Sequence, residues 1–159
     1  MNLYTIERLI KLIVVYLDNC CYSRLTDEDT QLNMIAEAAK IQTIIDNRFF
    51  SGYMIIGSRA VTAEIGNNRD VAKREESYRV YWDTVAGEVS ISEEVVTRAA
   101  ELELKGLGAM DSFHLAAAEA AVADYLLTTD IDFINKCSKP NFTFVKVINP
   151  LNFLKGGLP

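Results

Sequence analysis

The chain has 159 residues; half of them are hydrophobic, 24% are charged, and the formal net charge is -6. This profile excludes a disordered or fibrous protein and fits one globular domain with a single core. The negative charge also argues against a protein that holds nucleic acid on a broad basic face.

The N-terminus lacks the features of a membrane anchor or a secretory signal. The longest apolar run, Leu9 to Leu17, is interrupted by Lys11 and is shorter than the roughly 20 residues of a membrane-spanning helix. No small-residue cleavage site follows the first residues. We therefore expect a cytoplasmic protein, with residues 1–11 as an N-terminal extension and residues 12–159 as a single domain.

The first half of the chain predicts a buried strand and a long helix. The run Leu12–Asp18 is rich in β-branched and aromatic residues and is apolar on both alternating faces up to Asp18, as in a central parallel strand. Thr26 and Asp29 then resemble a capping box, and the periodic stretch that follows predicts one helix through Ile45. Asp18 thus falls at the carboxyl end of the strand.

A second buried strand, Gly52–Ser58, follows this helix. Ser58 is a suitable N-cap for a helix that carries Val61 and Ile65 and continues to Val71. Glu64 lies within two turns of the end of the strand.

The rest of the chain predicts three helices, two strands and one short apolar segment. In chain order they are the apolar segment Gly87–Ser92, a helix from Ser92 to about Lys105, an alanine-rich helix beginning near Asp111, the strand Tyr125–Asp130, a short helix over residues 131–136 and the strand Phe142–Ile148. Strands that alternate with helices on short connections predict an α/β protein, a three-layer α/β/α fold around a mostly parallel sheet.

In such sheets the ligand site lies outside the carboxyl ends of the strands. Asp18 and Asp130 each end an apolar strand, while Glu64 and Asp111 are expected in the opening turns of helices, where the dipole favours an ionised carboxylate. Carboxylates held together repel, so such a cluster raises a pKa or recruits a cation. Oxygen ligands without histidine or cysteine select Mg²⁺ or Mn²⁺ over Zn²⁺, and these ions promote phosphodiester hydrolysis.

The acidic composition is compatible with this chemistry. With four acids assigned to a metal cluster, the remaining charge is -6 + 4 = -2. Each acid also has a simpler interpretation: Asp130 can cap a helix, Asp111 can begin one, and Glu64 can be exposed. We interpret His114, one turn past Asp111, as a structural neighbour of the site.

Four strings, YLDNCCYSR, SRAVTAEIGNN, GLGAMDSFHLAAAEAAVADYLLTTDIDF and VINPLNFL, resemble the PIN-domain ribonucleases, including VapC-like toxins of toxin–antitoxin pairs. The resemblance covers almost the whole chain. It implies an RNA substrate, a Mg²⁺ or Mn²⁺ cofactor, an antitoxin partner and a homodimer. The implied catalytic and metal-binding residues are Asp18, Glu64, Asp111 and Asp130, with Asp132 as an auxiliary metal ligand and Asn19, Thr128 and Thr129 in supporting roles.

The sequence departs from this family in two places. Related chains commonly have asparagine, arginine and proline where this chain has Ser23, Arg24 and Leu25. The segment Met1–Lys11 is longer than the few residues expected before the first strand. We interpret it as an extra helix, a dimer contact or the result of a start codon assigned too early.

The acidic residues therefore predict metal-dependent hydrolysis of phosphodiesters, and the resemblance implies an endoribonuclease, with two alternatives. One is an aspartate-based phosphatase or phospho-acceptor domain, although such a phosphatase needs a second aspartate where this chain has Cys20. The other is a PIN-like domain that binds a partner without catalysis.

Overall fold

The computed structural model describes residues 12–28 and 30–153. The predicted N-terminal extension and Asp29 of the predicted capping box lie outside the described residues. None of the helices in these two ranges combines the length and hydrophobicity needed to cross a membrane.

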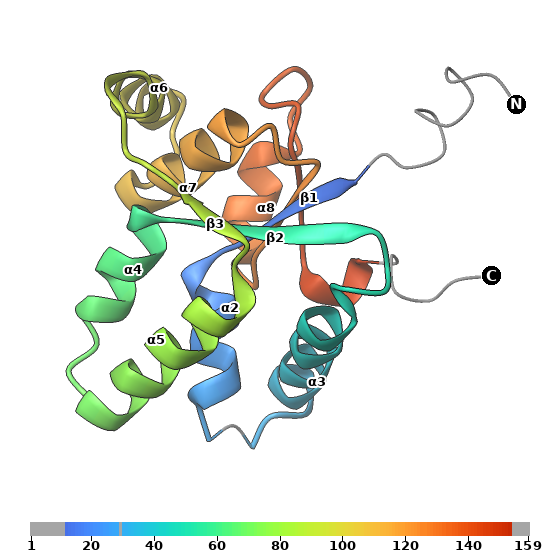
Figure 1. The fold of residues 1–159 in the computed structure, drawn as a ribbon. Helices are drawn as coiled ribbons and strands as arrows, with labels where there is room; N and C mark the ends of the chain where they lie inside the picture. The colour runs from blue at the N-terminus through green and yellow to red at the C-terminus, as the bar shows by residue number, and fades with distance from the viewer. Residues whose placement is uncertain (1–11, 29, 154–159) are drawn as a thin grey trace, which may run out of the picture.

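A five-stranded parallel sheet forms the centre of the molecule (Figure 1). Its strands stand in the order β3-β2-β1-β4-β5, so the first strand of the chain is also the middle one. Tyr16 in β1 lies opposite Ile56 on one side and Leu126 on the other. The strand bounds are β1 Ile13–Leu17, β2 Tyr53–Ser58, β3 Gly87–Val89, β4 Tyr125–Leu127 and β5 Lys146–Ile148.

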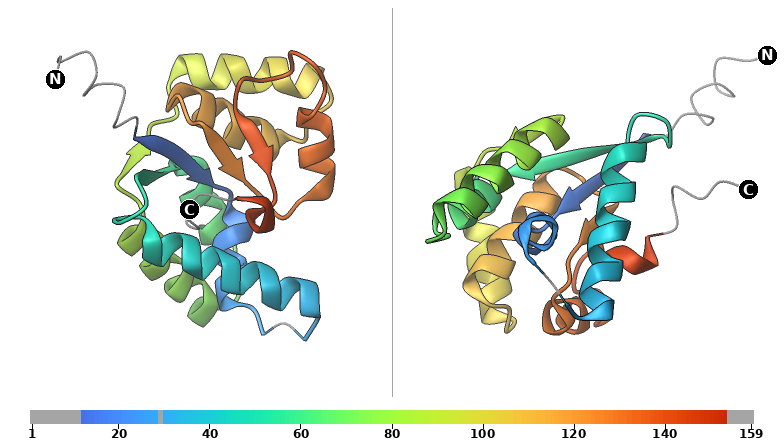
Figure 2. Two further views of the ribbon diagram at one scale, coloured as in Figure 1. Left: turned by 90° about the vertical axis from the view of Figure 1, so that its right-hand side faces the viewer. Right: turned by 90° about the horizontal axis from the view of Figure 1, so that it is seen from below.

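Helices cover both faces of the sheet, as Figure 2 shows. One face carries α2, α3 and α5, and the opposite face carries α6, α7 and α8, while α4 contacts α2, α5 and α7. This confirms the predicted three-layer α/β/α fold. The helix bounds are α2 Asn19–Thr26, α3 Leu32–Asn47, α4 Arg59–Gly66, α5 Val71–Thr84, α6 Glu93–Leu104, α7 Ala109–Ala120 and α8 Ile131–Cys137, with a 3-10 turn η1 at Pro150–Asn152.

Two helix predictions were wrong. The helix predicted from Thr26 to Ile45 begins only at Leu32, because the chain turns into α2 directly after β1 and α2 ends at Thr26, before the extended Asp27. The helix predicted to continue to Val71 ends at Gly66, because the Asp70 side chain accepts from the backbone N–H of Lys73 and caps a new helix, α5.

Close packing at the carboxyl end of β2 fixes one glycine. A Cβ atom on Gly57 would lie 2.1 Å from the hydroxyl of Tyr81, a fully buried side chain of α5. The Tyr81 hydroxyl donates to Glu88 Oε1 at 2.7 Å. The ring thus lies directly over the β2 backbone, and only glycine leaves room for it.

Candidate metal centre

Four acidic side chains from separate segments line one cleft at the carboxyl ends of the strands. Asp18 follows β1, Glu64 belongs to α4, Asp111 to α7, and Asp130 precedes α8. The cleft has a volume of about 320 Å³. Its described lining is Asp18, Asn19, Cys20, Ser23, Arg24, Asp27, Glu64, Asp111 and Asp130.

Asp18 is the most deeply set of the four acids, with 6% of its surface exposed. Its Oδ2 accepts hydrogen bonds from the Thr128 hydroxyl at 2.7 Å and the Cys20 thiol at 3.3 Å. The Thr128 hydroxyl oxygen also accepts from the backbone N–H of Asp130 at 3.1 Å. Thr128 therefore ties the ends of β1 and β4 together and orients the Asp18 carboxylate.

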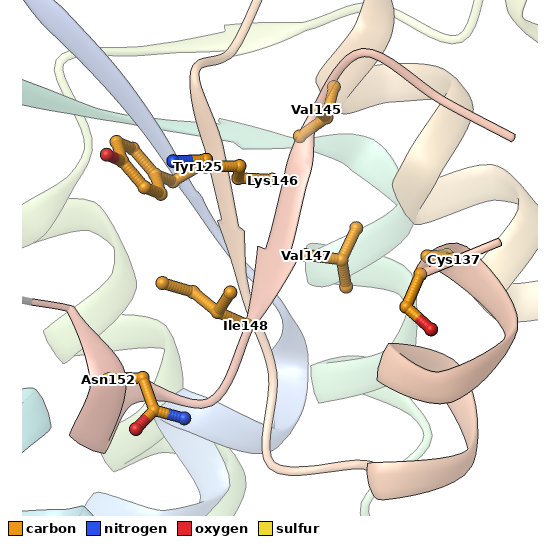
Figure 3. A pocket seen from close by; sticks show the side chains of 8 residues that line it. Tyr125, Cys137, Val145, Lys146, Val147, Ile148 and Asn152 are labelled. Atoms are coloured by element: carbon orange, nitrogen blue, oxygen red, sulfur yellow. The ribbon is translucent and has the colours of Figure 1, made fainter. Parts of the chain in front are cut away.

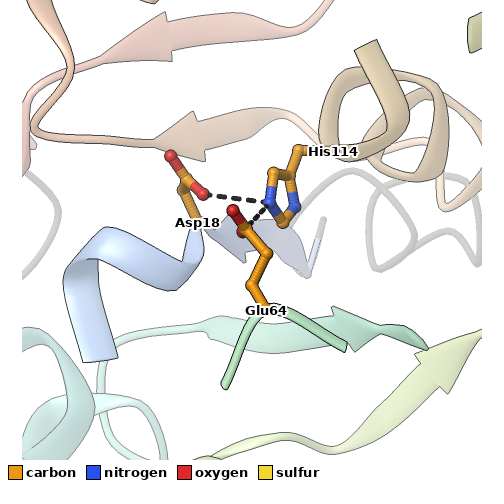
Figure 4. Close-up of side chains that lie close together, drawn as sticks. All are labelled: Asp18, Glu64 and His114. Atoms are coloured by element: carbon orange, nitrogen blue, oxygen red, sulfur yellow. Dashed lines mark hydrogen bonds and ion pairs between the residues drawn. The ribbon is translucent and has the colours of Figure 1, made fainter. Parts of the chain in front are cut away.

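His114 lies between two of the acids (Figure 4). Its Nε2 is 3.2 Å from Asp18 Oδ1 and 2.5 Å from Glu64 Oε2, and 1% of the residue is exposed. One ligand atom from each of the three residues lies within 4.8 Å of the others. Sequence reasoning had treated this histidine as a neighbour of the site, whereas its ring is at the centre of the cluster.

Glu64 reaches this cluster from an unexpected part of its helix. It lies two residues before the end of α4 and not in an opening turn. Glu64 is therefore not at the positive end of the helix dipole. Asp111 is in the first turn of α7, as the sequence predicted.

The other ring nitrogen of His114 is held by a chain of hydroxyl groups. Nδ1 is 2.8 Å from the hydroxyl of Tyr16, which is 2.6 Å from the hydroxyl of Ser58. Ser58 Oγ also accepts from the backbone N–H of Ala60 and so caps α4, as the sequence predicted. These residues are buried, so the ring orientation is set by the core.

Two titratable groups of the site have shifted pKa values. The pKa of Asp111 is raised to about 6, first by burial and then by the nearby charges of Asp18 and Asp130. Burial lowers the pKa of His114, but Asp18 and Glu64 outweigh that effect and raise it above its ordinary value. Both shifts express the same condition, a surplus of negative charge in a partly desolvated cleft.

Asp130 has two roles in the structure, since it lines the cleft and also caps α8. Its Oδ1 accepts from the backbone N–H groups of Asp132 and Phe133 at 2.9 and 3.1 Å. The helix-cap interpretation is thus confirmed. Asp132 is exposed, and its side chain is not among those that line the cleft.

The predicted supporting residues surround Asp18 in different ways. Asn19 lines the cleft, and its Oδ1 is buried with no hydrogen-bond partner among residues 12–28 and 30–153. The backbone N–H of Thr129 donates to Cys20 Sγ at 3.2 Å, and Thr129 Oγ1 accepts from Arg24 at 3.4 Å. Arg24 is also paired with buried Glu37, whose Oε2 is 3.2 Å from its Nε.

The donor set fits a divalent ion. Carboxylate oxygens of Asp18 and Glu64 and an imidazole nitrogen of His114 converge on one place. Hard divalent ions prefer oxygen ligands, and an imidazole extends the set towards transition metals.

A larger hollow lies elsewhere, along the free edge of β5 (Figure 3). Its volume is about 410 Å³, and its lining includes Tyr125, Cys137, Val147, Ile148 and Asn152. In Figure 3, Val147 lies towards Cys137, whereas Ile148 lies towards Asn152, on the other face of the strand. Aliphatic groups dominate this lining, so the hollow lacks the convergent charges of the acidic cleft.

Comparisons with known proteins agree with this geometry. Residues 15–139 match the model of the PIN domain. No curated protein matches the chain in sequence.

Three solved structures share the fold at low sequence identity. VapBC2 from Rickettsia felis bound to a DNA fragment from their promoter has 15% identity and a TM-score of 0.57, covering 86% of this chain and 98% of its own. FitAcB from Neisseria gonorrhoeae has 14% identity and a TM-score of 0.54, with coverages of 87% and 99%. VapC20 of Mycobacterium tuberculosis, a sarcin-ricin loop cleaving toxin, has 12% identity and a TM-score of 0.58, with coverages of 82% and 98%. Since the PIN model spans most of the sequence and the fold agrees, the chain belongs to the PIN domain family.

Proposed function

We propose that this PIN domain protein is a metal-dependent endoribonuclease that acts in the cytoplasm. The observation that carries the proposal is the cleft in which acids from four separate segments face one another. We assign catalytic and metal-binding roles to Asp18, Glu64, Asp111 and Asp130. A divalent ion bound there, Mg²⁺ or Mn²⁺, would activate water and stabilise charge on the oxygens of a phosphodiester.

The residues around the acids support this role by fixing their geometry. Thr128 orients one oxygen of Asp18, and His114 contacts the other. Asn19 lines the cleft, where it would position a ligand or a water molecule. We do not carry Asp132 into the metal site, because it is exposed and is not among the residues that line the cleft.

The test is cleavage of a single-stranded RNA by the purified full chain with Mg²⁺ or Mn²⁺. We expect Asp18→Asn to reduce the rate by more than about 100-fold, the upper end of losses for groups that only support a metal ligand. Asp132→Asn is the matched control and should retain activity. Cleavage that survives both Asp18→Asn and a chelator would contradict the proposal.

The two alternatives have their own readouts. Calorimetry that detects no Mn²⁺ binding would favour a partner-binding domain without catalysis. A beryllium fluoride adduct on Asp18 would favour a phosphatase or phospho-acceptor, although the Asp18 carboxylate is held on both oxygens by Thr128 and His114.

We further propose a small antitoxin that covers the acidic cleft, and a homodimer. Support comes from the shared fold with VapBC2, FitAcB and VapC20, and from the negative charge of the cleft, which suits a basic segment. Co-purification with the product of an adjacent small open reading frame, followed by light scattering, tests both. A monomer that stays fully active with that product present would contradict them.

A further inference from the structure

The imidazole of His114 is placed as metal-binding histidines are. Its Nε2 points at two carboxylates, 3.2 Å from Asp18 Oδ1 and 2.5 Å from Glu64 Oε2 (Figure 4). A buried nitrogen between two carboxylates requires a hydrogen-bond donor or a cation at that place, because the carboxylates otherwise repel each other in a desolvated site. Either a proton on Nε2 or a metal ion provides it.

The hydroxyl chain on the opposite side of the ring is compatible with the metal-bound form. When Tyr16 donates its proton to Ser58 Oγ, its oxygen accepts from Nδ1–H of His114. This arrangement leaves the lone pair of Nε2 directed at Asp18 and Glu64. Histidines that ligate metals usually donate their other ring N–H to a second group in this way, which fixes the tautomer and the ring orientation.

We propose that His114 Nε2 binds the metal directly, together with Asp18 and Glu64, and that this nitrogen makes the centre prefer Mn²⁺ to Mg²⁺. The inference rests on the proposed metal-dependent function and specifies its ligands. Carboxylates alone suit Mg²⁺ and Mn²⁺ alike, whereas an imidazole ligand favours first-row transition ions. Tyr16 is then a positioning residue that acts through His114.

The sequence allows a direct test on the unaltered protein, because His114 is the single histidine of the chain. Protein free of any histidine tag is produced with ¹⁴N- or ¹⁵N-histidine, loaded with Mn²⁺ and measured by pulsed electron paramagnetic resonance. We expect a nitrogen coupling that changes with the isotope, as for a directly bound nitrogen. Bound Mn²⁺ without a histidine coupling would overturn the inference and leave the proposed function standing. Absence of Mn²⁺ binding would contradict both.

Metal selectivity gives a second readout that does not depend on activity. Calorimetry of the metal-free wild type should give a lower Kd for Mn²⁺ than for Mg²⁺. His114→Gln replaces the nitrogen by an amide, and the ratio of the two Kd values should fall about 10-fold or more. Folding of the variant is checked by circular dichroism and Tm. An unchanged ratio in a folded variant would overturn the inference.

Tyr16→Phe separates ligation from orientation. The variant retains His114 but loses the hydroxyl that holds Nδ1, so Mn²⁺ affinity should fall about 10-fold, within the range for groups that support a metal ligand. The isotope-dependent nitrogen coupling should remain. Unchanged affinity would contradict the positioning role of Tyr16.

Discussion

The two ends of the sheet both carry acidic residues, but the partners of these residues differ. At the amino ends, Asp124 precedes β4, and its Oδ2 accepts from the backbone N–H of Val14 at 3.0 Å. At the carboxyl ends, Asp18, Glu64 and Asp111 share one cleft with Asp130. A carboxylate bound to a backbone amide stabilises the fold by itself, whereas carboxylates that face one another need a cation. The position of an acid thus says less about its role than the group that it faces.

The largest effect is expected from Gly57→Ala, which tests how tightly the carboxyl end is built. The new methyl group would overlap the ring of Tyr81, so the free energy of unfolding should fall by about 3 kcal/mol, the upper end for overpacking in a core. Urea denaturation measures the loss. Gly87→Ala is the control, because a Cβ there meets no atom within 4 Å among the described residues. Equal losses in the two variants would contradict this account.

The variant Thr128→Val tests whether contacts at the carboxyl end of the sheet, unlike those at the amino end, support metal binding. The change removes the hydroxyl that donates to Asp18 and accepts from Asp130 N–H, so the free energy of unfolding should fall by about 2 kcal/mol. Affinity for Mn²⁺ should fall about 10-fold, because a ligand loses its orienting partner. Asp124→Asn, at the opposite end, should leave the Mn²⁺ affinity unchanged in calorimetry. Equal losses of Mn²⁺ affinity in both variants would contradict the difference between the two ends of the sheet.

Asp111→Asn tests the charge surplus in metal-free protein. The pKa of Asp111 is about 6 in the folded chain against an ordinary value of 3.8, so the folded state holds its proton more strongly. The stability from that proton is complete below pH 3.8 and is lost as the pH rises through 6.

At pH 7.5 the ionised carboxylate therefore destabilises the fold. Since Asp111 is partly exposed and screened by solvent, the variant should be more stable by about 1 kcal/mol. Thermal unfolding in chelator at pH 7.5 and pH 4 measures the difference, which should be much smaller at pH 4. A gain that is independent of pH would contradict this origin.

The smallest effect is expected from Val122→Gly at the amino end. Val122 is a β-branched residue with a φ of 51°, a conformation that strains it and suits glycine. Glycine relieves this strain but has a greater chain entropy in the unfolded state, and the two effects oppose each other. The net result should be a rise of about 0.5 kcal/mol in the free energy of unfolding. Chemical denaturation measures the gain, and Mn²⁺ binding should not change. A loss of stability would show that Val122 is not strained.

The strand ends made much of this site predictable. Asp18 and Asp130 end apolar segments, and a parallel sheet brings such ends to one edge, so their place in the cleft follows from the sequence. The position of His114 between Asp18 and Glu64 depends on how α4 packs against α7, which local sequence does not encode. One signal was available, since His114 lies three residues after Asp111 and therefore on the same side of the helix.

The errors in the predicted helix boundaries also arise from the packing of helices against one another. Thr26 ends α2 instead of beginning α3, because α2 packs on α5 while α3 packs on η1. The helix α5 has many charged residues and a weak apolar pattern, so its existence depends on the Asp70 cap and on the burial of Tyr81. The Asp70 cap is a local signal, whereas the burial of Tyr81 depends on tertiary contacts and not on sequence periodicity.

The hydroxyl of Tyr16, which joins Ser58 to His114, means that the cluster exists only when β1, β2 and α7 are all in place. An ion that binds this cluster therefore binds the fully folded chain and not a partly unfolded one. At 100 times its Kd, such an ion would add about 2.7 kcal/mol to the free energy of unfolding. Resistance to proteolysis in the cell would then follow the supply of metal, and depletion of metal would shorten the lifetime of the protein as well as stop its chemistry.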